Sequence, residues 1–199
     1  MSDLGALRRE LTEFSQRSFN RHLVSGTGGN LSLRVPGTDT VLITPSGVSL
    51  GDIEPEMNIL VNLDGEILDS PMNFNGSKET GFHLEAYRTR QGCAAVAHVH
   101  PPYATAYSCL GKDLPLGTIS ARVGLKRVPC VECFMPGSSE LCSAVSGGIT
   151  DYPESNALLM KEHGILTMAE SMSLAYYVAD LVEDSAKIAF VAANIHTDI

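Results

Sequence analysis

Apolar residues near the start of the chain recur at the period of an amphipathic helix. Between residues 3 and 21, leucine and phenylalanine occur every three to five positions, with arginine and glutamate between them. This spacing lines apolar side chains along one helical face, so we expect a helix over residues 3–21. The following residues, Ser25 to Asn30, are glycine-rich and polar and predict a loop.

The pattern then changes to short alternating or β-branched runs, which are typical of antiparallel strands. Gly, Pro and Asp separate these runs. The dipeptide Asp64-Gly65 is the strongest turn signal, because glycine readily adopts the positive φ of a tight hairpin. We expect four strands here, over residues 31–35, 41–44, 59–63 and 66–68.

In the second half of the chain, helical and strand patterns alternate. Residues 94–100 form an apolar run that predicts a buried strand, which ends at Pro101-Pro102. No linker rich in Gly, Ser or Pro divides the chain, and no internal repeat occurs. We therefore expect one domain over residues 1–199, of the α/β or α+β class with a mixed sheet. The other predicted elements are helices over 78–90, 103–110, 138–146 and 171–194 and strands over 126–134 and 157–160.

Composition narrows the possible partners. The 199 residues include 14 Lys+Arg against 23 Asp+Glu, a net charge of −9, and 44% are hydrophobic, which is enough to bury a core without disulfides. The negative charge and the lack of a basic run argue against nucleic acid or an anionic membrane surface as a partner. No stretch approaches the ~18 apolar residues of a membrane span, and the first residues lack the features of a secretory signal. Five cysteines without framework spacing indicate free thiols, so we expect a cytoplasmic protein.

Two histidines stand two positions apart at the end of the predicted buried strand. Side chains at i and i+2 share one face of a strand, so the imidazoles of His98 and His100 point the same way. A buried imidazole without a partner costs about 1–3 kcal/mol. Either a metal ion or backbone carbonyls could be that partner, and this motif alone leaves both interpretations open.

A third imidazole follows another predicted strand. His163 comes after the apolar run at 157–160 and directly before Gly164, where a histidine is more often a surface turn residue. Three imidazoles with an open fourth position are nevertheless typical of a catalytic divalent-metal site. Zinc is the leading metal for this type of ligand.

Glu79 and His83 are one helical turn apart, which places both on the same face of the helix predicted ahead of the His-x-His strand. Glu79 could ligate the metal or act as a base. Alternatively, it complements the positive end of the helix dipole, with Ser77 as the cap and His83 as a packed neighbour.

Two loops and one helix start offer groups that suit a phosphate dianion. The loops are Gly26-Thr27-Gly28-Gly29-Asn30 and Thr44-Pro45-Ser46-Gly47, and Ser77 and Lys78 open the predicted helix. Exposed backbone N–H groups near a helix N-terminus bind anions. Each loop alone is a weak signal, since Gly and Pro usually mark turns. The first is not a dinucleotide-binding fingerprint, because it follows a helix and opens a strand.

Cys130 and Cys133 have the spacing of redox and zinc-ribbon thiols. No second cysteine pair accompanies them, and their neighbours predict a strand instead of a helix N-terminus. We therefore interpret this spacing as incidental.

Taken in order, these motifs resemble those of the class II aldolase/adducin family. They are Ser25–Asn30, Thr44–Gly47, Ser77–His83, His98-Val99-His100-Pro101-Pro102 and Glu162-His163-Gly164. The resemblance covers essentially the whole chain, and five ordered motifs are specific for the family although none identifies the substrate. It implies a three-layer α/β/α sandwich with a central, largely antiparallel mixed sheet. It also implies a homotetramer with active sites at subunit interfaces.

The resemblance assigns a role to each motif. The metal-binding histidines of the family fall on His98, His100 and His163, and its catalytic acid/base falls on Glu79. The implied cofactor is a divalent metal, with zinc as the leading candidate, and the implied substrate is a small phosphorylated sugar or sugar acid. The family's phosphate pocket falls on Gly29, Asn30, Ser46, Gly47 and Ser77, with Lys78 after that serine.

Two reactions of the family fit this site. Aldol cleavage of a sugar phosphate and decarboxylation of 3-oxo-tetronate 4-phosphate both leave an enediolate that a divalent ion would stabilise. We rank aldol cleavage first because it is the commoner activity in the family. Lys78, where fuculose-type aldolases carry a second serine, and the lack of a tyrosine within Leu114–Arg127 favour decarboxylation. A third interpretation is a non-catalytic adducin-like oligomerisation module, but such members have lost the metal ligands that this chain retains.

Overall fold

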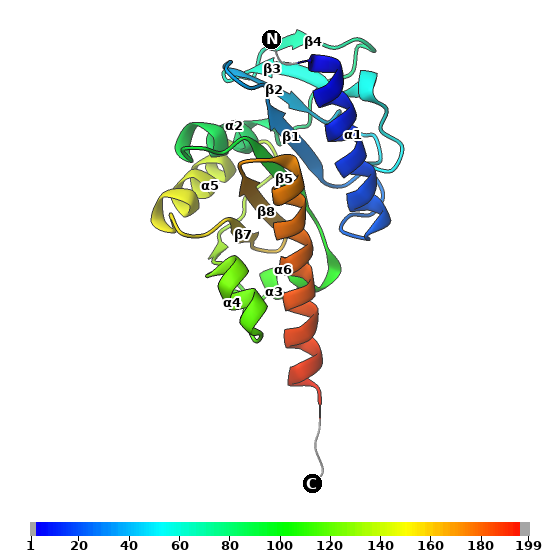
Figure 1. Ribbon diagram of the computed structural model, residues 1–199. Coiled ribbons are helices and arrows are strands. Elements are labelled where there is room, and N and C mark those ends of the chain that lie inside the picture. Colours follow the sequence, from blue (N-terminus) through cyan, green and yellow to red (C-terminus); the bar gives the residue numbers. More distant parts are fainter. Residues whose placement is uncertain (1–2, 196–199) are drawn as a thin grey trace.

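A mixed sheet forms the middle layer of the protein (Figure 1). In the computed structural model, which describes residues 3–195, eight strands pair in the order β4-β3-β2-β1-β5-β8-β7-β6. Only β6 and β7 pair in parallel among these strands, as expected for a largely antiparallel sheet. The strands are β1 (Asn30–Arg34), β2 (Thr40–Ile43), β3 (Ile59–Asn62), β4 (Ile67–Asp69), β5 (Ala95–Val99), β6 (Cys130–Val131), β7 (Ala157–Met160) and β8 (Gly164–Ala169).

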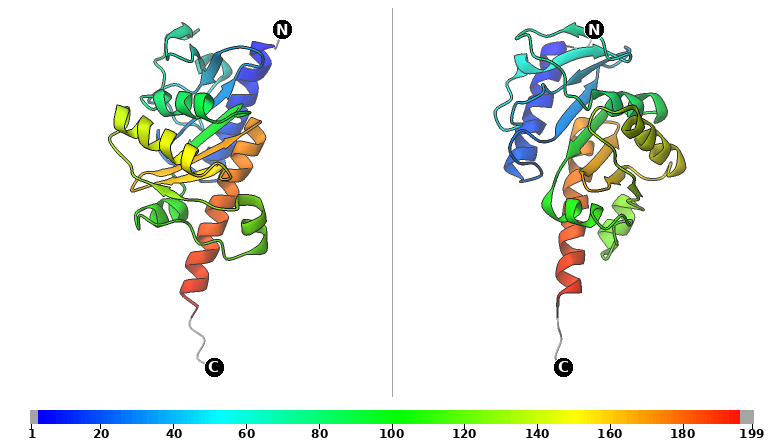
Figure 2. Two further views of the ribbon diagram at one scale, coloured as in Figure 1. Left: turned by 90° about the vertical axis from the view of Figure 1, so that its left-hand side faces the viewer. Right: turned by 180° about the vertical axis from the view of Figure 1, so that it is seen from behind.

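Helices cover both faces of the sheet (Figure 2). On one face, α2 and α5 bury residues such as Phe82 and Leu141, and on the other face α1 and α6 bury residues such as Leu11 and Met172. The arrangement is the three-layer α/β/α sandwich predicted from the sequence. The helices are α1 (Leu4–Asn20), α2 (Thr80–Thr89), α3 (Pro102–Ser108), α4 (Ile119–Leu125), α5 (Ser139–Asp151) and α6 (Met172–Ala193), with a 3-10 turn at Pro55–Met57.

Local chemistry explains where several elements begin and end. The predicted cap Ser171 accepts a hydrogen bond from the backbone N–H of Leu174 at 3.3 Å, which starts α6. The β3–β4 hairpin turns at Gly65, whose φ is 87°, as the Asp64-Gly65 signal predicted. The start of α6 and the turn between β3 and β4 therefore follow from residue preferences that the sequence shows.

The structure differs from the prediction at four elements in the second half of the chain. The strand predicted over 126–134 is restricted to β6, because this edge strand pairs only with β7 and the preceding Pro129 has no N–H to donate. Residues 119–125 form α4, which was not predicted, and α5 continues to Asp151 instead of ending at residue 146. Strand β8 was also missed, since most of its residues are buried and it lacks the alternation of a half-exposed strand.

The sheet joins both halves of the chain, because β1 pairs with β5. The domain was expected over residues 1–199, of which 1–2 and 196–199 lie outside the described residues. Within residues 3–195, no helix is both long enough and apolar enough to cross a membrane.

The centre of the sheet positions the polar residues of the candidate site. Asn30 on β1 is the cross-strand partner of His98 on β5, and partners directly opposite each other share one face of the sheet. Strand β5 also pairs with β8, and His163 lies in the turn just before β8. Residues from three distant parts of the sequence therefore meet at one end of β5.

Candidate metal centre and active-site cavity

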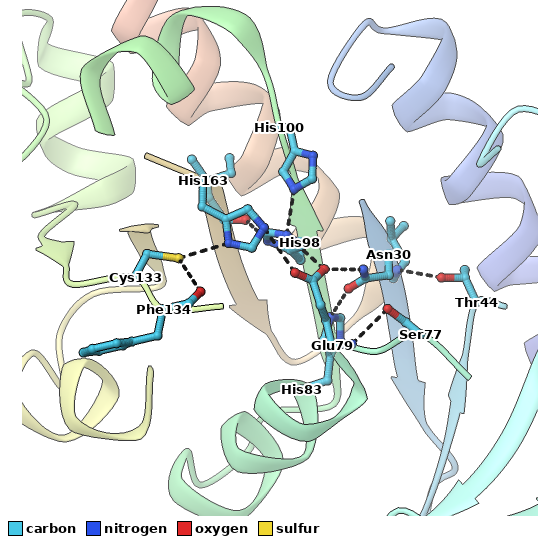
Figure 3. Close-up of polar contacts among 12 residues, drawn as sticks. Asn30, Thr44, Ser77, Glu79, His83, His98, His100, Cys133, Phe134 and His163 are labelled. Atoms are coloured by element: carbon cyan, nitrogen blue, oxygen red, sulfur yellow. Dashed lines mark hydrogen bonds and ion pairs between the residues drawn. The ribbon is translucent and has the colours of Figure 1, made fainter. Parts of the chain in front are cut away.

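Three imidazoles converge at the end of β5 (Figure 3). The ring centroids of His98 and His100 lie 4.6 Å apart, and those of His98 and His163 lie 4.8 Å apart. One ligand atom from each of the three residues lies within 4.8 Å of the other two. The fold thus brings together the three histidines that the sequence placed far apart.

The position of His100 depends on two glycines in different loops. A Cβ on Gly164 would lie 2.5 Å from Cδ2 of His100, and a Cβ on Gly28 would lie 2.9 Å from its Nδ1. Both distances are shorter than van der Waals contact, so any larger residue would move the imidazole. The loop before β1 and the β7–β8 turn therefore make room for this ring.

The hydrogen bonds of His98 suit a metal ligand. Its Nδ1 lies 2.9 Å from the carbonyl oxygen of Ile165, which can only accept, so this nitrogen carries the ring proton. Nε2 then has a free lone pair, and it lies 2.8 Å from Nε2 of His100. A ring whose other nitrogen donates to a backbone carbonyl is the usual form of a metal-binding histidine. The three residues could therefore hold a divalent ion such as zinc.

Glu79 lies beside this triad. It is the residue before α2, not a first-turn residue of the predicted helix, and its side chain does not cap that helix. Oε1 lies 3.1 Å from Nε2 of His163, and Oε2 lies 3.3 Å from Nε2 of His98. Burial alone would raise the pKa of this carboxyl, but the hydrogen bond with His163, the electrostatic interaction with His98 and the hydrogen bond from Asn30 together lower the pKa below its usual range. Glu79 is therefore ionised.

Cys133 contacts the third imidazole, which the sequence did not indicate. Its Sγ lies 3.2 Å from Nδ1 of His163, whereas Sγ of Cys130 contacts the carbonyl of Ser108. The two thiols thus do not act as a pair, in line with the interpretation of their spacing as incidental. Burial lowers the pKa of His163, but its hydrogen bonds with Cys133 and Glu79 raise the pKa to about 9. The contact between Cys133 and His163 arises because β6 and β7 pair in parallel, and these residues follow the two strands. No sequence motif indicates that pairing.

One cavity of about 320 Å³ unites the triad with the two loops. It contains nine of the ten predicted site residues, and the tenth, His98, is fully buried behind them. The second loop is joined to the segment before Ser77 by a bridge between Pro45 and Gly76. The cavity is lined by Thr27, Gly28, Gly29, Asn30, Pro45, Ser46, Gly47, Ser77, Lys78, Glu79, His100, Pro136 and His163.

The sequence is similar to a known protein family and to named relatives over most of its length. Residues 9–190 match the family described as class II aldolase and adducin N-terminal domain. The L-fuculose phosphate aldolase of Methanococcus maripaludis is 33% identical over 189 residues, which are 94% of this chain and 99% of that protein. The 3-oxo-tetronate 4-phosphate decarboxylase of Escherichia coli is 34% identical over 196 residues, with 95% and 88% covered.

The fold is also similar to that of a solved structure. YgbL from Klebsiella pneumoniae superposes with a TM-score of 0.88 at 30% identity, covering 100% of this chain and 95% of that one. The similarity therefore extends over the whole fold, including every element that contributes to the cavity.

Proposed function

The chain belongs to the class II aldolase and adducin family, and we propose that, as a lyase of this type, it cleaves a carbon–carbon bond in a small phosphorylated sugar. The observation that carries this proposal is the convergence of three imidazoles and an ionised carboxylate in one cavity. We assign zinc, or another divalent ion, to His98, His100 and His163. We also assign the whole chain to one domain.

The phosphate of the substrate would lie at the other end of the cavity. Gly29, Asn30, Ser46, Gly47, Ser77 and Lys78 all line it and offer backbone N–H groups, an amide, hydroxyls and an ammonium group. These donors gather near the N-terminus of α2, whose positive dipole end favours an anion. A phosphate held there would leave the rest of a small sugar facing Glu79 and the triad.

Glu79 would move the proton in this reaction. When bound, a divalent ion supplies a Lewis acid that polarises the carbonyl next to the bond being broken. The ionised Glu79 carboxylate faces the same imidazoles, so it can accept a proton from a substrate hydroxyl and return it to carbon. Its burial keeps bulk water from competing for that proton.

Decarboxylation of a 3-oxo-tetronate 4-phosphate at the same site is a second candidate. Lys78 is exposed at the cavity, where its ammonium group can pair with the carboxylate that leaves. This reaction converts no substrate hydroxyl into an aldehyde, so it needs no tyrosine to exchange that hydroxyl's proton, and residues 114–127 contain none. A non-catalytic oligomerisation module receives no support from a chain that retains a complete triad.

We further propose that the chain assembles as a homotetramer in the cytoplasm. Helix α6 extends beyond the rest of the fold (Figure 1), and its last turns expose Ile188, Phe190 and Val191. An apolar surface of this kind favours contact with another subunit. All five cysteines are free, which suits a reducing compartment.

Product analysis tests the proposal. The protein is purified without chelator, its metal content is measured, and it is incubated with C4 to C6 sugar phosphates and sugar-acid phosphates. We expect about one equivalent of zinc per chain and release of an aldehyde from a ketose phosphate. Release of CO₂ instead would select the decarboxylase. Protein that holds no metal, gains none from added zinc and forms neither product would overturn the proposal.

A further inference from the structure

A line of hydrogen bonds leads from the core to the Glu79 carboxylate. The hydroxyl of Tyr87 lies 2.7 Å from Oγ of Ser32, which lies 2.7 Å from Nδ1 of His83. Nε2 of His83 lies 2.6 Å from Oδ1 of Asn30 (Figure 3). Nδ2 of Asn30 then donates to Oε2 of Glu79 at 2.8 Å. We call Tyr87, Ser32, His83 and Asn30 the polar line.

The polar line crosses an interface that is otherwise apolar. Asn30 and Ser32 alternate on β1 and so share one face, while His83 and Tyr87 are one turn apart on α2. Ser32 and His83 are fully buried, in the core that contains Phe82 and Val96. Apolar side chains of similar shape would cost little stability in such a place. Packing therefore does not explain why four polar residues are present.

The charge of Glu79 determines the direction of every bond in this line. A carboxylate only accepts, so Asn30 must present its NH₂ group to Glu79 and its Oδ1 to His83. Nε2 of His83 must then carry the ring proton, since two acceptors would otherwise face each other at 2.6 Å.

The inner half of the line follows from the same reasoning. Burial lowers the pKa of His83 to about 4, so the ring is neutral and its Nδ1 carries no proton. Ser32 therefore donates its only proton to Nδ1. Burial raises the pKa of Tyr87, so its hydroxyl keeps its proton and donates it to Ser32. Each donor thus meets one acceptor, in a single direction from Tyr87 to Glu79.

We propose that His83, as the neutral ring with its proton on Nε2, is a positioning residue that holds the Asn30 amide with its NH₂ group towards Glu79. His83 does not line the cavity, so it acts through Asn30 and not on the substrate. An amide that turned over would direct an oxygen at the carboxylate and push it away from the imidazoles. The catalytic part of this proposal rests on the proposed function, whereas the protonation of the ring does not.

Nuclear magnetic resonance of the wild-type protein tests the ring directly. Long-range proton–nitrogen spectra distinguish the two neutral forms of a histidine, and the full chain is recorded without metal and with zinc. We expect a proton on Nε2 of His83 in both samples, with slow exchange against water because the ring is fully buried. A proton on Nδ1, or a mixture of the two forms, would overturn the proposal whether or not the protein is a lyase.

Two amide substitutions separate positioning from packing. His83→Gln keeps an N–H donor close to the place of Nε2, whereas His83→Asn reaches only the place of Nδ1 and cannot bond to Asn30. Deuterium exchange on dihydroxyacetone phosphate is measured well below the unfolding temperature. We expect His83→Asn to lose about 10–100-fold in rate and His83→Gln to recover most of it, with zinc content unchanged in both.

Matched controls and wild-type data keep the outcomes distinct. Tyr176→Phe removes a hydroxyl from another buried tyrosine outside the polar line and should leave exchange at the wild-type rate. Equal rates for the two His83 variants would overturn the positioning role. If both variants fail to fold, the ring form in the wild-type protein still decides. If the wild-type protein itself shows no exchange, the proposed function fails while the ring measurement stands.

Discussion

Oε1 of Glu79 lies 3.1 Å from Nε2 of His163, so the carboxylate contacts one of the three imidazoles that could hold a metal ion. In the absence of a metal, a proton between these atoms is stabilised, because the pKa of Glu79 is lowered and that of His163 is raised to about 9. A metal ligand must give up that proton. A metal ion held by His163 would therefore compete with the ion pair for the same imidazole.

Removing one imidazole should prevent stable metal binding. We expect His98→Ala and His163→Ala to lose zinc and turnover while keeping the fold, since each provides one of three converging ligand atoms. Metal content after gel filtration and far-ultraviolet circular dichroism are the measurements. His22→Asn is the control, because His22 has a φ of 61° that asparagine tolerates and it lies outside the cavity. Full activity in either alanine variant would remove that residue from the site.

Glu79→Gln should separate metal binding from proton transfer. The amide keeps the size of the side chain but cannot accept a proton, so we expect deuterium exchange on dihydroxyacetone phosphate to fall at least about 100-fold. Zinc content should stay near that of the wild type, because the three imidazoles are intact. Glu56→Gln, a change at an exposed glutamate outside the cavity, serves as the control. Undiminished exchange would refute the base role.

Replacing Gly164 with alanine tests whether His100 needs the space that this glycine leaves. In Gly164→Ala the new Cβ would meet both the imidazole and the carbonyl oxygen of Val99, at 2.5 and 2.6 Å. We expect unfolding in urea to show a loss of about 1–3 kcal/mol, together with weaker zinc binding. Gly117→Ala is the matched control, since nothing lies within 4 Å of its new Cβ. Equal zinc affinity in the two variants would show that His100 adjusts freely.

The candidate site residues could be named from the sequence because they lie in five short motifs in a fixed order, although each motif alone was a weak signal. His98 lies on a strand whose apolar run is evident, His100 directly follows that strand, and His163 follows a strand that was predicted with its observed bounds. The resemblance supplied the expectation that they meet. Sequence alone could not supply the distances, because strand β8, which pairs with β5 next to the triad, was not predicted.

The relation between Glu79 and His83 shows what pattern analysis misses. One helical turn separates them, so a direct contact on one helix face was a reasonable expectation. Helix α2 instead begins at Thr80, and the two side chains meet through Asn30, which comes from β1. Cys133 was missed for the same reason, since its contact with His163 comes from strand pairing and not from spacing.

The phosphate pocket makes a prediction about substrate preference. Ser77 lines the cavity just before α2, and its hydroxyl accepts a hydrogen bond from the backbone N–H of Glu79 at 3.2 Å, which leaves its own proton for a ligand. Loss of a hydrogen bond to a charged group costs about 1.5–3 kcal/mol, so Ser77→Ala should raise KM for phosphorylated substrates about 10–100-fold. The same variant assayed with an unphosphorylated substrate is the internal control. An equal rise for both substrates would mean that the phosphate binds elsewhere.

The buried ring of His83 should make stability depend on pH in a defined window. Its pKa is about 4 in the folded chain, because burial disfavours the charged form, and about 6.5 in an unfolded chain. Between pH 4 and pH 6.5 the unfolded chain binds a proton at His83 and the folded chain does not, so the free energy of unfolding rises with pH. The stability that the neutral ring contributes is therefore complete above pH 6.5 and is lost as the pH falls towards 4.

His83→Gln cannot titrate, so it isolates this contribution from those of the other histidines. Urea unfolding of both metal-free proteins is measured from pH 4 to pH 7. The free energy of unfolding of the wild type minus that of the variant should rise by about 3 kcal/mol between pH 4 and 6.5 and then stay level. A difference that does not change with pH would mean that the folded chain also accepts the proton. The ring could not then be the neutral donor on which the orientation of Asn30 depends.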